Sequence, residues 1–128
     1  MQRATPIAAA IAAIILAFAA PAPASAGYGA IAYDQDSGKQ GASWNQRTPA
    51  AANEAALKSC ASAACRVHPV EPAGCGALAL SDKDKDGHIY WGGADREKLD
   101  AAKREAVAHC QTHTTDGTCT VRVSGCNK

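Results

Sequence analysis

The six cysteines are the residues whose chemistry this sequence defines best. An even number of cysteines in a small extracytoplasmic domain is typical of a disulfide framework. No two of them have the C-x-x-C spacing of dithiol redox centres. We therefore expect three structural disulfides, although six cysteines by themselves allow 15 pairings. The cysteines are Cys60, Cys65, Cys75, Cys110, Cys119 and Cys126.

An acidic segment spaces three carboxylates two residues apart, at Asp82, Asp84 and Asp86, and Gly87 follows. This spacing resembles the first half of a calcium-binding EF-hand loop. The twelfth loop position, where a bidentate glutamate is needed, is Gly93. We therefore favour an exposed, charged hairpin turn, with a weak divalent-cation site on the three aspartates as the alternative. No other cofactor is expected.

Candidate catalytic groups are few. His109 and His113 lie four residues apart, as metal ligands on a helix can. If Cys110 is in a disulfide, however, only these two ligands remain. No serine has a nucleophile-elbow pattern, and sequence alone does not pair two of the 12 acidic residues across a cleft. We assign no catalytic residue and expect a protein that is not an enzyme.

The aromatic residues are scarce. Trp44 and Trp91 are expected in the core because little else in the chain is large. Tyr33 and Tyr90 are the candidates for a more exposed surface that contacts a partner.

The N-terminus has the features of a secretory signal peptide. Arg3 supplies a short basic region, and an uncharged apolar run follows over residues 7–20. Ala24-Ser25-Ala26 then has the small-residue pattern of a cleavage site. The run is too short to span a bilayer of about 30 Å. We therefore predict a signal peptide over residues 1–26 and a periplasmic or secreted domain over residues 27–128.

The charge of the exported part excludes some partners. Removing Arg3 from the 13 basic residues leaves 12, which balances the 12 acidic residues. A neutral surface argues against nucleic-acid binding and against electrostatic docking on anionic lipid. We expect no nucleic-acid partner and no membrane insertion after cleavage.

The exported part contains an internal duplication. The motif Gly-Ala-Ile-Ala at residues 29–32 returns as Gly-Ala-Leu-Ala at residues 76–79, and Trp44 and Trp91 have the same 47-residue spacing. We predict two β-β-α-β repeats, over residues 27–70 and 75–126, joined by residues 71–74. The fold class is α+β, with about six strands in antiparallel sheet and two helices on a shared or paired sheet. The predicted strands are 28–33, 41–44, 65–70, 76–80, 88–91 and 118–124, with a turn over 81–87.

The two predicted helices begin at equivalent positions. Thr48 caps the first helix and is followed by proline, and Asp95, 47 residues later, is expected to cap the second. The first helix runs over residues 50–61, and the second reaches Cys110. The distance from cap to helix-end cysteine is then 12 residues in the first repeat and 15 in the second, a difference close to one helical turn.

The duplication reduces the possible disulfide pairings. Cys60 and Cys110 take one equivalent position, at a helix end, and Cys65 and Cys119 take another, at the start of the last strand. Cys75 and Cys126 have no counterpart in the first repeat and form the third pair. The other four can pair within each repeat or across the repeats. We favour the local pairs, 60–65 and 110–119, because short connections bring the chain back within bridging distance.

These features together resemble a known family. Tyr28-Gly-Ala-Ile-Ala, Trp44, an alanine-rich helix that ends at Cys60, and the repeated Cys75-Gly-Ala-Leu-Ala are similar to exported bacterial proteins grouped as domain of unknown function 4189. The resemblance covers residues 27–128. It implies a small secreted or periplasmic domain held by disulfides, and it implies no activity, because the family has no agreed catalytic residues.

We therefore expect an exported, non-catalytic binding protein with a protein partner in the envelope or outside the cell. One alternative is an inhibitor or immunity-type protein against a hydrolase such as lysozyme, since rigidity lowers the cost of binding. A small secreted hydrolase is the other alternative.

Overall fold

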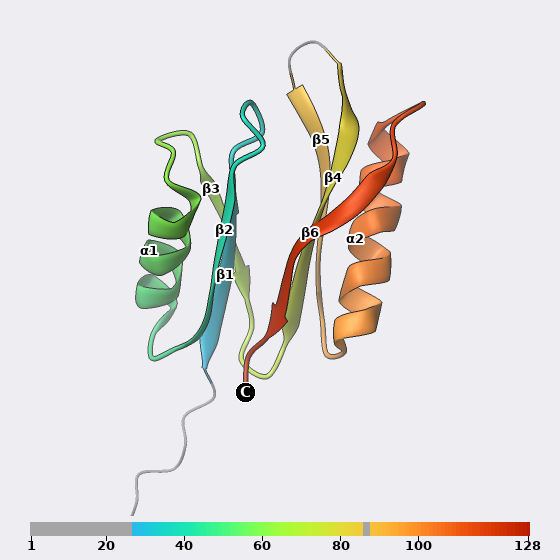
Figure 1. Cartoon of the computed structure of the whole chain (residues 1–128). Helices are drawn as coiled ribbons and strands as arrows, with labels where there is room; N and C mark the ends of the chain where they lie inside the picture. Colours follow the sequence, from blue (N-terminus) through green and yellow to red (C-terminus); the bar gives the residue numbers. More distant parts are fainter. Residues whose placement is uncertain (1–26, 86–87) are drawn as a thin grey trace, which may run out of the picture.

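The computed structural model describes residues 27–85 and 88–128, and the side chains of residues 83–92 lie outside the description. Within these residues the chain forms six strands and two helices in the predicted β-β-α-β order, repeated once (Figure 1). The elements are β1 (Tyr28–Tyr33), β2 (Gln40–Gln46), α1 (Pro49–Cys60), β3 (Arg66–Val70), β4 (Cys75–Lys85), β5 (His88–Arg96), α2 (Leu99–His113) and β6 (Cys119–Cys126). The duplicated α+β fold is confirmed.

The strands form two separate three-stranded antiparallel sheets. Each repeat makes one sheet with its first strand in the centre, in the orders β2-β1-β3 and β5-β4-β6. Figure 1 shows the sheets face to face, with α1 outside the first and α2 outside the second. The molecule thus has four layers, and of the two arrangements left open by the sequence it uses paired sheets.

Alternation along the central strands sorts side chains by size. In β1, Ala30 and Ala32 face α1, and in β4 Ala77 and Ala79 face α2. The intervening larger residues fill the space between the sheets. This central cluster contains Ile31, Tyr33, Val70, Leu78 and Leu80, with Ala42, Trp44 and Val123 packed against it. Small residues under the helices permit close packing, and the larger ones hold the sheets together.

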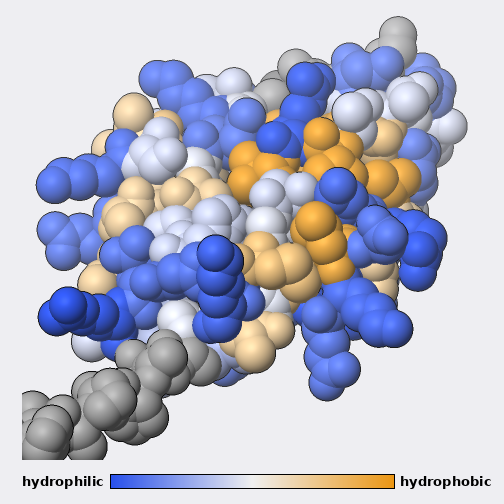
Figure 2. Space-filling view, turned by 60° about the horizontal axis from the view of Figure 1, so that its bottom comes forward, coloured by the Kyte–Doolittle hydropathy of each residue, from blue (hydrophilic) through white to orange (hydrophobic). Residues whose placement is uncertain are grey.

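The helices repeat the same buried pattern. Ala52, Ala56 and Cys60 are buried in α1, and Ala102, Ala106 and Cys110 are buried in α2. Four-residue spacing places each set on one face of its helix. Figure 2 shows that, on the face it presents, hydrophobic residues gather toward the middle and the repeat-two side, with hydrophilic residues around them.

The start of the second helix differs from the prediction. Asp95 lies in β5, and the N-cap residue of α2 is Lys98, which makes no side-chain cap hydrogen bond. Thr48 caps α1 as predicted, accepting a hydrogen bond from the Ala51 N–H. From N-cap to bridging cysteine both helices therefore count 12 residues, to Cys60 and to Cys110. The three extra residues therefore lie upstream of the N-cap of α2 and not within the helix.

The second hairpin is longer than predicted. Strand β4 continues to Lys85 and β5 begins at His88, so most of the turn predicted over 81–87 is strand. Tyr33 pairs with Gln40 in the first hairpin, whereas its counterpart Leu80 pairs with Trp91. Six residues separate the first pair and ten the second. The four additional residues carry the β4–β5 hairpin beyond the equivalent end of the first sheet (Figure 1).

The prediction that the two tryptophans are equivalent is wrong. Trp91 pairs through its backbone with Leu80, so its counterpart in the first sheet is Gln40. Trp44 lies four residues farther along, in a bulge where Trp44 and Asn45 together oppose Gly29. The equal spacing in sequence does not survive in the sheets because the hairpin lengths differ.

Trp44 is half-buried between the sheets in a slot lined by glycine. A methyl group built on Gly125 of β6 would lie 2.5 Å from Trp44 Cε2, and one on Gly29 would lie 2.9 Å from Trp44 Cε3. A methyl group built on Gly76 of β4 would lie 3.5 Å from Trp44 Cη2 and 2.6 Å from Val70 Cγ2. One large side chain from the first repeat therefore occupies space that glycines of both repeats leave open.

Candidate functional site

The three disulfides have the pairing favoured from the sequence. Cys60–Cys65 joins the end of α1 to the start of β3, with its Cα atoms 6.3 Å apart, and Cys110–Cys119 joins α2 to β6, at 5.9 Å. Cys75–Cys126 links directly paired positions of β4 and β6. All six cysteines lie in the described residues and none is free. Each bridge lies within one repeat, so the two halves are held to each other by non-covalent contacts.

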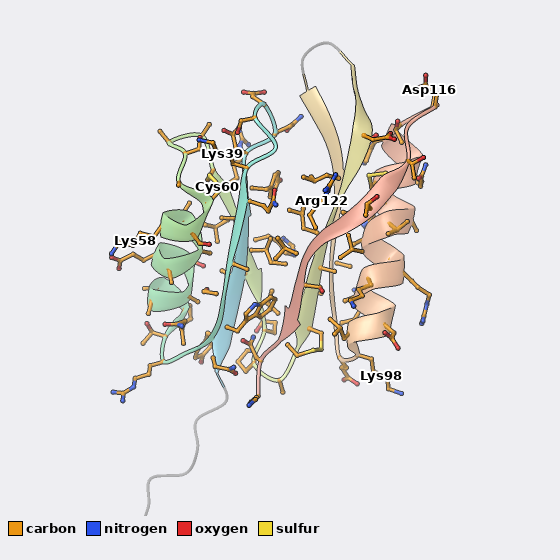
Figure 3. All side chains as sticks on the ribbon, in the orientation of Figure 1. Lys39, Lys58, Cys60, Lys98, Asp116 and Arg122 are labelled. Carbon is orange, nitrogen blue, oxygen red and sulfur yellow. A yellow bond between two sulfur atoms is a disulfide. The ribbon has the colours of Figure 1, made fainter. Side chains whose placement is uncertain are left out.

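Asp34 is the most elaborately bonded carboxylate in the described part of the chain. It follows β1 and is only 5% exposed. Its Oδ2 accepts hydrogen bonds from Ser37 Oγ and Ser62 Oγ, both at 2.7 Å, and its Oδ1 accepts from the backbone N–H of Asp36 at 3.0 Å. Asp34 thereby ties the β1–β2 loop to the connection between α1 and β3. In Figure 3 these loops lie at the end of the first sheet marked by Lys39 and Cys60.

These hydrogen bonds control the charge of Asp34. The bond from Ser62 makes the largest contribution, followed by those from Ser37 and Asp36, and together they lower the pKa of Asp34 to about 2. The carboxylate therefore stays ionised at neutral pH and is occupied by structural donors. In the second repeat the corresponding residue is Ser81, whose Oγ donates to Thr114 Oγ1 at 3.3 Å, so a neutral pair replaces the anion.

Two surface depressions are lined by described residues. One, of about 420 Å³, lies beside Asp34 and is also bordered by Asp36, Cys65 and Arg66. The other, of about 500 Å³, lies at the joint between the repeats, between residues 71–74 and residues 95–97. The Asp95 carboxylate in this joint accepts a hydrogen bond from the Glu71 N–H at 3.3 Å. Both depressions are formed by loops and adjoining strand ends, and both mix acidic with basic side chains.

The proposed cation ligands are only partly within the description. Asp82 is exposed, and its Oδ1 accepts a hydrogen bond from the Thr118 N–H at 2.7 Å, which holds the residue before β6 against β4. The side chains of Asp84 and Asp86 lie outside the described residues. Within residues 27–85 and 88–128 as described, no group of three or more His, Cys, Asp or Glu side chains could hold a metal ion.

His109 and His113 are both exposed on α2. The His109 ring nitrogen Nδ1 lies 3.1 Å from the carbonyl oxygen of Gly93 in β5, so this imidazole contacts the strand beside its helix. His109 therefore contributes to the packing of α2 on β5.

Tyr33 does not contribute an exposed partner surface. It is 8% exposed and belongs to the central cluster between the sheets. Burial raises the pKa of Tyr33, and the charge of Arg66, its partner across β1 and β3, acts in the opposite direction. Alternation along β1 turns Tyr33 toward the second sheet, which explains the burial. The Tyr90 side chain lies outside the described residues.

Sequence reasoning missed Asn127, which follows the last cysteine. Asn127 is 5% exposed, and its Nδ2 donates to the carbonyl oxygens of Val70 and Glu71 at 3.1 and 2.9 Å. Its Oδ1 accepts from the Asn45 N–H at 3.1 Å. A residue at the end of the second repeat thus satisfies three backbone groups of the first repeat and the joint. A polar residue directly after a strand-end cysteine carried no signal of this contact.

The fold and the bridges define a small duplicated α+β domain cross-linked by disulfides. The chain belongs to the family described as domain of unknown function 4189 (DUF4189), whose model matches residues 28–126. No helix among residues 27–85 and 88–128 is long and apolar enough to cross a membrane.

The relatives that resemble this chain include mycobacterial proteins. Rv1813c of Mycobacterium tuberculosis and Mb1843c of Mycobacterium bovis, both named as uncharacterised proteins, are 40% identical to this chain over 87 residues. The match covers 68% of this chain and 55% of those relatives. The NMR structure of Rv1813c superposes with a TM-score of 0.53 at 28% identity, covering 99% of both chains. The fold is therefore shared with a solved structure.

Proposed function

We propose that this protein is an exported, non-catalytic binding protein that contacts its partner through the β4–β5 hairpin. The supporting observation is the length of that hairpin. Ten residues separate Leu80 from Trp91, where the first repeat has six between Tyr33 and Gln40. The β4–β5 hairpin is therefore four residues longer than its counterpart in the first repeat. Binding residues concentrate on loops that a rigid scaffold holds in place.

Export is supported by the disulfides and by the sequence of the N-terminus. Disulfides form and persist in oxidising compartments and are rare in the reducing cytosol. All six cysteines of this chain are paired. The apolar run over residues 7–20 and the A-x-A pattern before Gly27 are typical of a leader that directs a chain to such a compartment.

The absence of catalysis is supported by the state of Asp34. Many enzymes use a carboxyl group whose pKa is raised toward neutrality as a general acid. Asp34 is the buried carboxylate of the described chain, and its hydrogen bonds shift the pKa in the opposite direction, to about 2. Its oxygens are occupied by donors from two loops. Such a group suits loop attachment better than proton transfer.

The test is capture of a partner by the folded domain. Residues 27–128, oxidised and immobilised, would be incubated with envelope and secreted fractions, beside a variant in which residues 83–90 are shortened by four. We expect a specific partner on the wild type and not on the shortened variant, with the melting temperature of the variant nearly unchanged. As a control for surface charge, Lys58→Glu on the exposed face of α1 should leave capture unchanged.

Failure to capture any partner, or equal capture by the shortened variant, would contradict the proposal. The same preparation added to hydrolases tests the second candidate, an inhibitor of an enzyme such as lysozyme, which a projecting hairpin on a cross-linked scaffold favours. A fall in lysozyme turnover that the shortened variant does not cause would support this candidate. Hydrolysis by the protein itself would instead favour the third class, a small secreted hydrolase.

A further inference from the structure

The two ends of the described domain meet in one small cluster formed by Gly27, Asn45, Asn127 and Lys128, the terminal cluster. The Gly27 N–H donates to the Lys128 backbone oxygen at 3.2 Å, and the Lys128 N–H donates to Asn45 Oδ1 at 2.6 Å. Asn45 in turn donates its backbone N–H to Asn127 Oδ1. The first residue before β1 and the last residues after β6 are therefore hydrogen-bonded across the two repeats.

The position of Gly27 admits no side chain. Gly27 is buried, and a methyl group built on it would lie 2.4 Å from Asn45 Cα, closer than any real contact of this kind. Asn45 is held in the left-handed region with φ 56°, where asparagine is tolerated. A glycine is therefore required at the point where the fold begins, and its nitrogen is directed to the last strand's end.

The Gly27 nitrogen is also the atom that cleavage of the predicted leader would release. The small-residue pattern Ala24-Ser25-Ala26 ends at the preceding residue. A leader peptidase adds water across the Ala26–Gly27 peptide bond. The carbonyl carbon of Ala26 gains the hydroxyl and becomes a carboxylate, the C–N bond breaks, and the Gly27 nitrogen takes up protons to become an ammonium.

We propose that this cleavage has a structural consequence: the new α-ammonium of Gly27 strengthens the contact with Lys128 and so closes the two repeats on each other. Before cleavage the donor to the Lys128 oxygen is a neutral amide, and afterwards it is a cation. Charge-assisted hydrogen bonds are roughly twice as strong as neutral ones. The effect falls on the interface that no disulfide spans. This inference rests on the proposed export.

The experiment compares three forms of the oxidised domain. One begins at Gly27 with a free amine, one is the same chain N-acetylated, and one begins at Ala26. All three keep the N–H donor, but the ammonium is at Gly27 only in the first. We expect the free-amine form to melt roughly 3 to 6 °C higher than the other two at neutral pH, and those two to agree with each other.

A matched control removes the acceptor. In chains that lack Lys128, the free-amine and acetylated forms should have the same melting temperature. Equal melting of the free-amine and acetylated forms in the chain that retains Lys128 would overturn the inference, as would a difference that persists without Lys128.

Export is measured separately from this comparison. Mass spectrometry of the exported protein identifies its first residue, and a start at Gly27 supports the inference. An exported chain that starts elsewhere contradicts the inference and leaves export standing. A chain that stays uncleaved in the cytoplasm contradicts export, and the acetylation comparison still reports whether an ammonium at Gly27 stabilises the fold.

Discussion

The slot that holds Trp44 predicts a large effect from a very small change, the replacement Gly125→Ala. The added methyl carbon would lie 2.5 Å from Trp44 Cε2, 2.7 Å from Cζ2 and 2.8 Å from Nε1. Carbon atoms attract each other best at about 3.5–4.0 Å. The indole must therefore move by about an ångström, or the sheets must separate, and either change disturbs the packing between the two repeats.

The cost follows from the packing of the central cluster. The indole also lies close to β1, since a methyl group built on Gly29 would be 2.9 Å from its Cε3. Forcing an extra methyl group into a well-packed site typically costs about 1–3 kcal/mol. For a domain of this size that lowers the melting temperature by roughly 4–20 °C.

The assay is a double-mutant cycle measured by urea unfolding under oxidising conditions. Gly125→Ala, Trp44→Leu and the double variant are compared with the wild type, and Ser124→Ala on the same strand is the control. In the Trp44→Leu background the methyl group has space, so Gly125→Ala should cost less than about 0.5 kcal/mol there. The coupling energy should then be at least about 1 kcal/mol.

The reasoning is refuted if Gly125→Ala costs the same with and without the indole. That result would mean that the glycine is needed for its backbone conformation or strand twist and not to admit Trp44. A cost at Ser124→Ala equal to that at Gly125→Ala would likewise show a general sensitivity of β6.

Three further predictions concern charge, capping and cross-linking. The pKa of Asp34 is about 2 in the folded protein, below its ordinary value of 3.8, so ionised Asp34 stabilises the fold above pH 3.8. This stabilisation is lost as the pH falls toward 2. In thermal melts the melting temperature should therefore fall on acidification, and it should fall less in Asp34→Asn. Lys98→Ser should supply the cap hydrogen bond that α2 lacks and raise stability by about 0.5–1 kcal/mol in urea unfolding, and no gain would contradict the assigned helix start. Replacing Cys75 and Cys126 together by alanine removes a bridge that spans 51 residues and should lower the free energy of unfolding by about 4 kcal/mol. Removing either short bridge should lower it by about 2–3 kcal/mol. An equal loss of stability for all three pairs would argue against the chain-entropy account.

The parts of the fold that the sequence predicted are those governed by local patterns. The repeated Gly-Ala-aliphatic-Ala motif located both central strands, in which Ile31 and Leu78 lie on the opposite face from the alanines. Thr48 followed by proline located the start of α1. Lys98 is not a typical N-cap residue, so in the second repeat the duplication suggested Asp95 instead. The predicted start of α2 was therefore three residues too early.

The candidate site was less predictable, because it depends on contacts between distant segments. Asp34 and Ser62 are 28 residues apart, and Asn45 and Asn127 are 82 apart, and their hydrogen bonds form only when two loops or two chain ends meet. Tyr33 was expected to be more exposed than the tryptophans. The second sheet covers the Tyr33 side chain, and no local sequence pattern predicts that contact.

The sequence by itself determined the duplication and the order of the elements, and it reduced the pairing of the cysteines to two alternatives, since each depends on spacing along the chain. The structure decided between those two pairings. Only the tertiary structure decided that the sheets pack face to face, that Trp44 alone fills a slot between them, and that the ends of the chain join the halves. The physical reason is that small residues permit close approach without specifying what approaches. The glycines at 29, 76 and 125 leave space, and the partner that occupies it is set by the geometry of the whole domain.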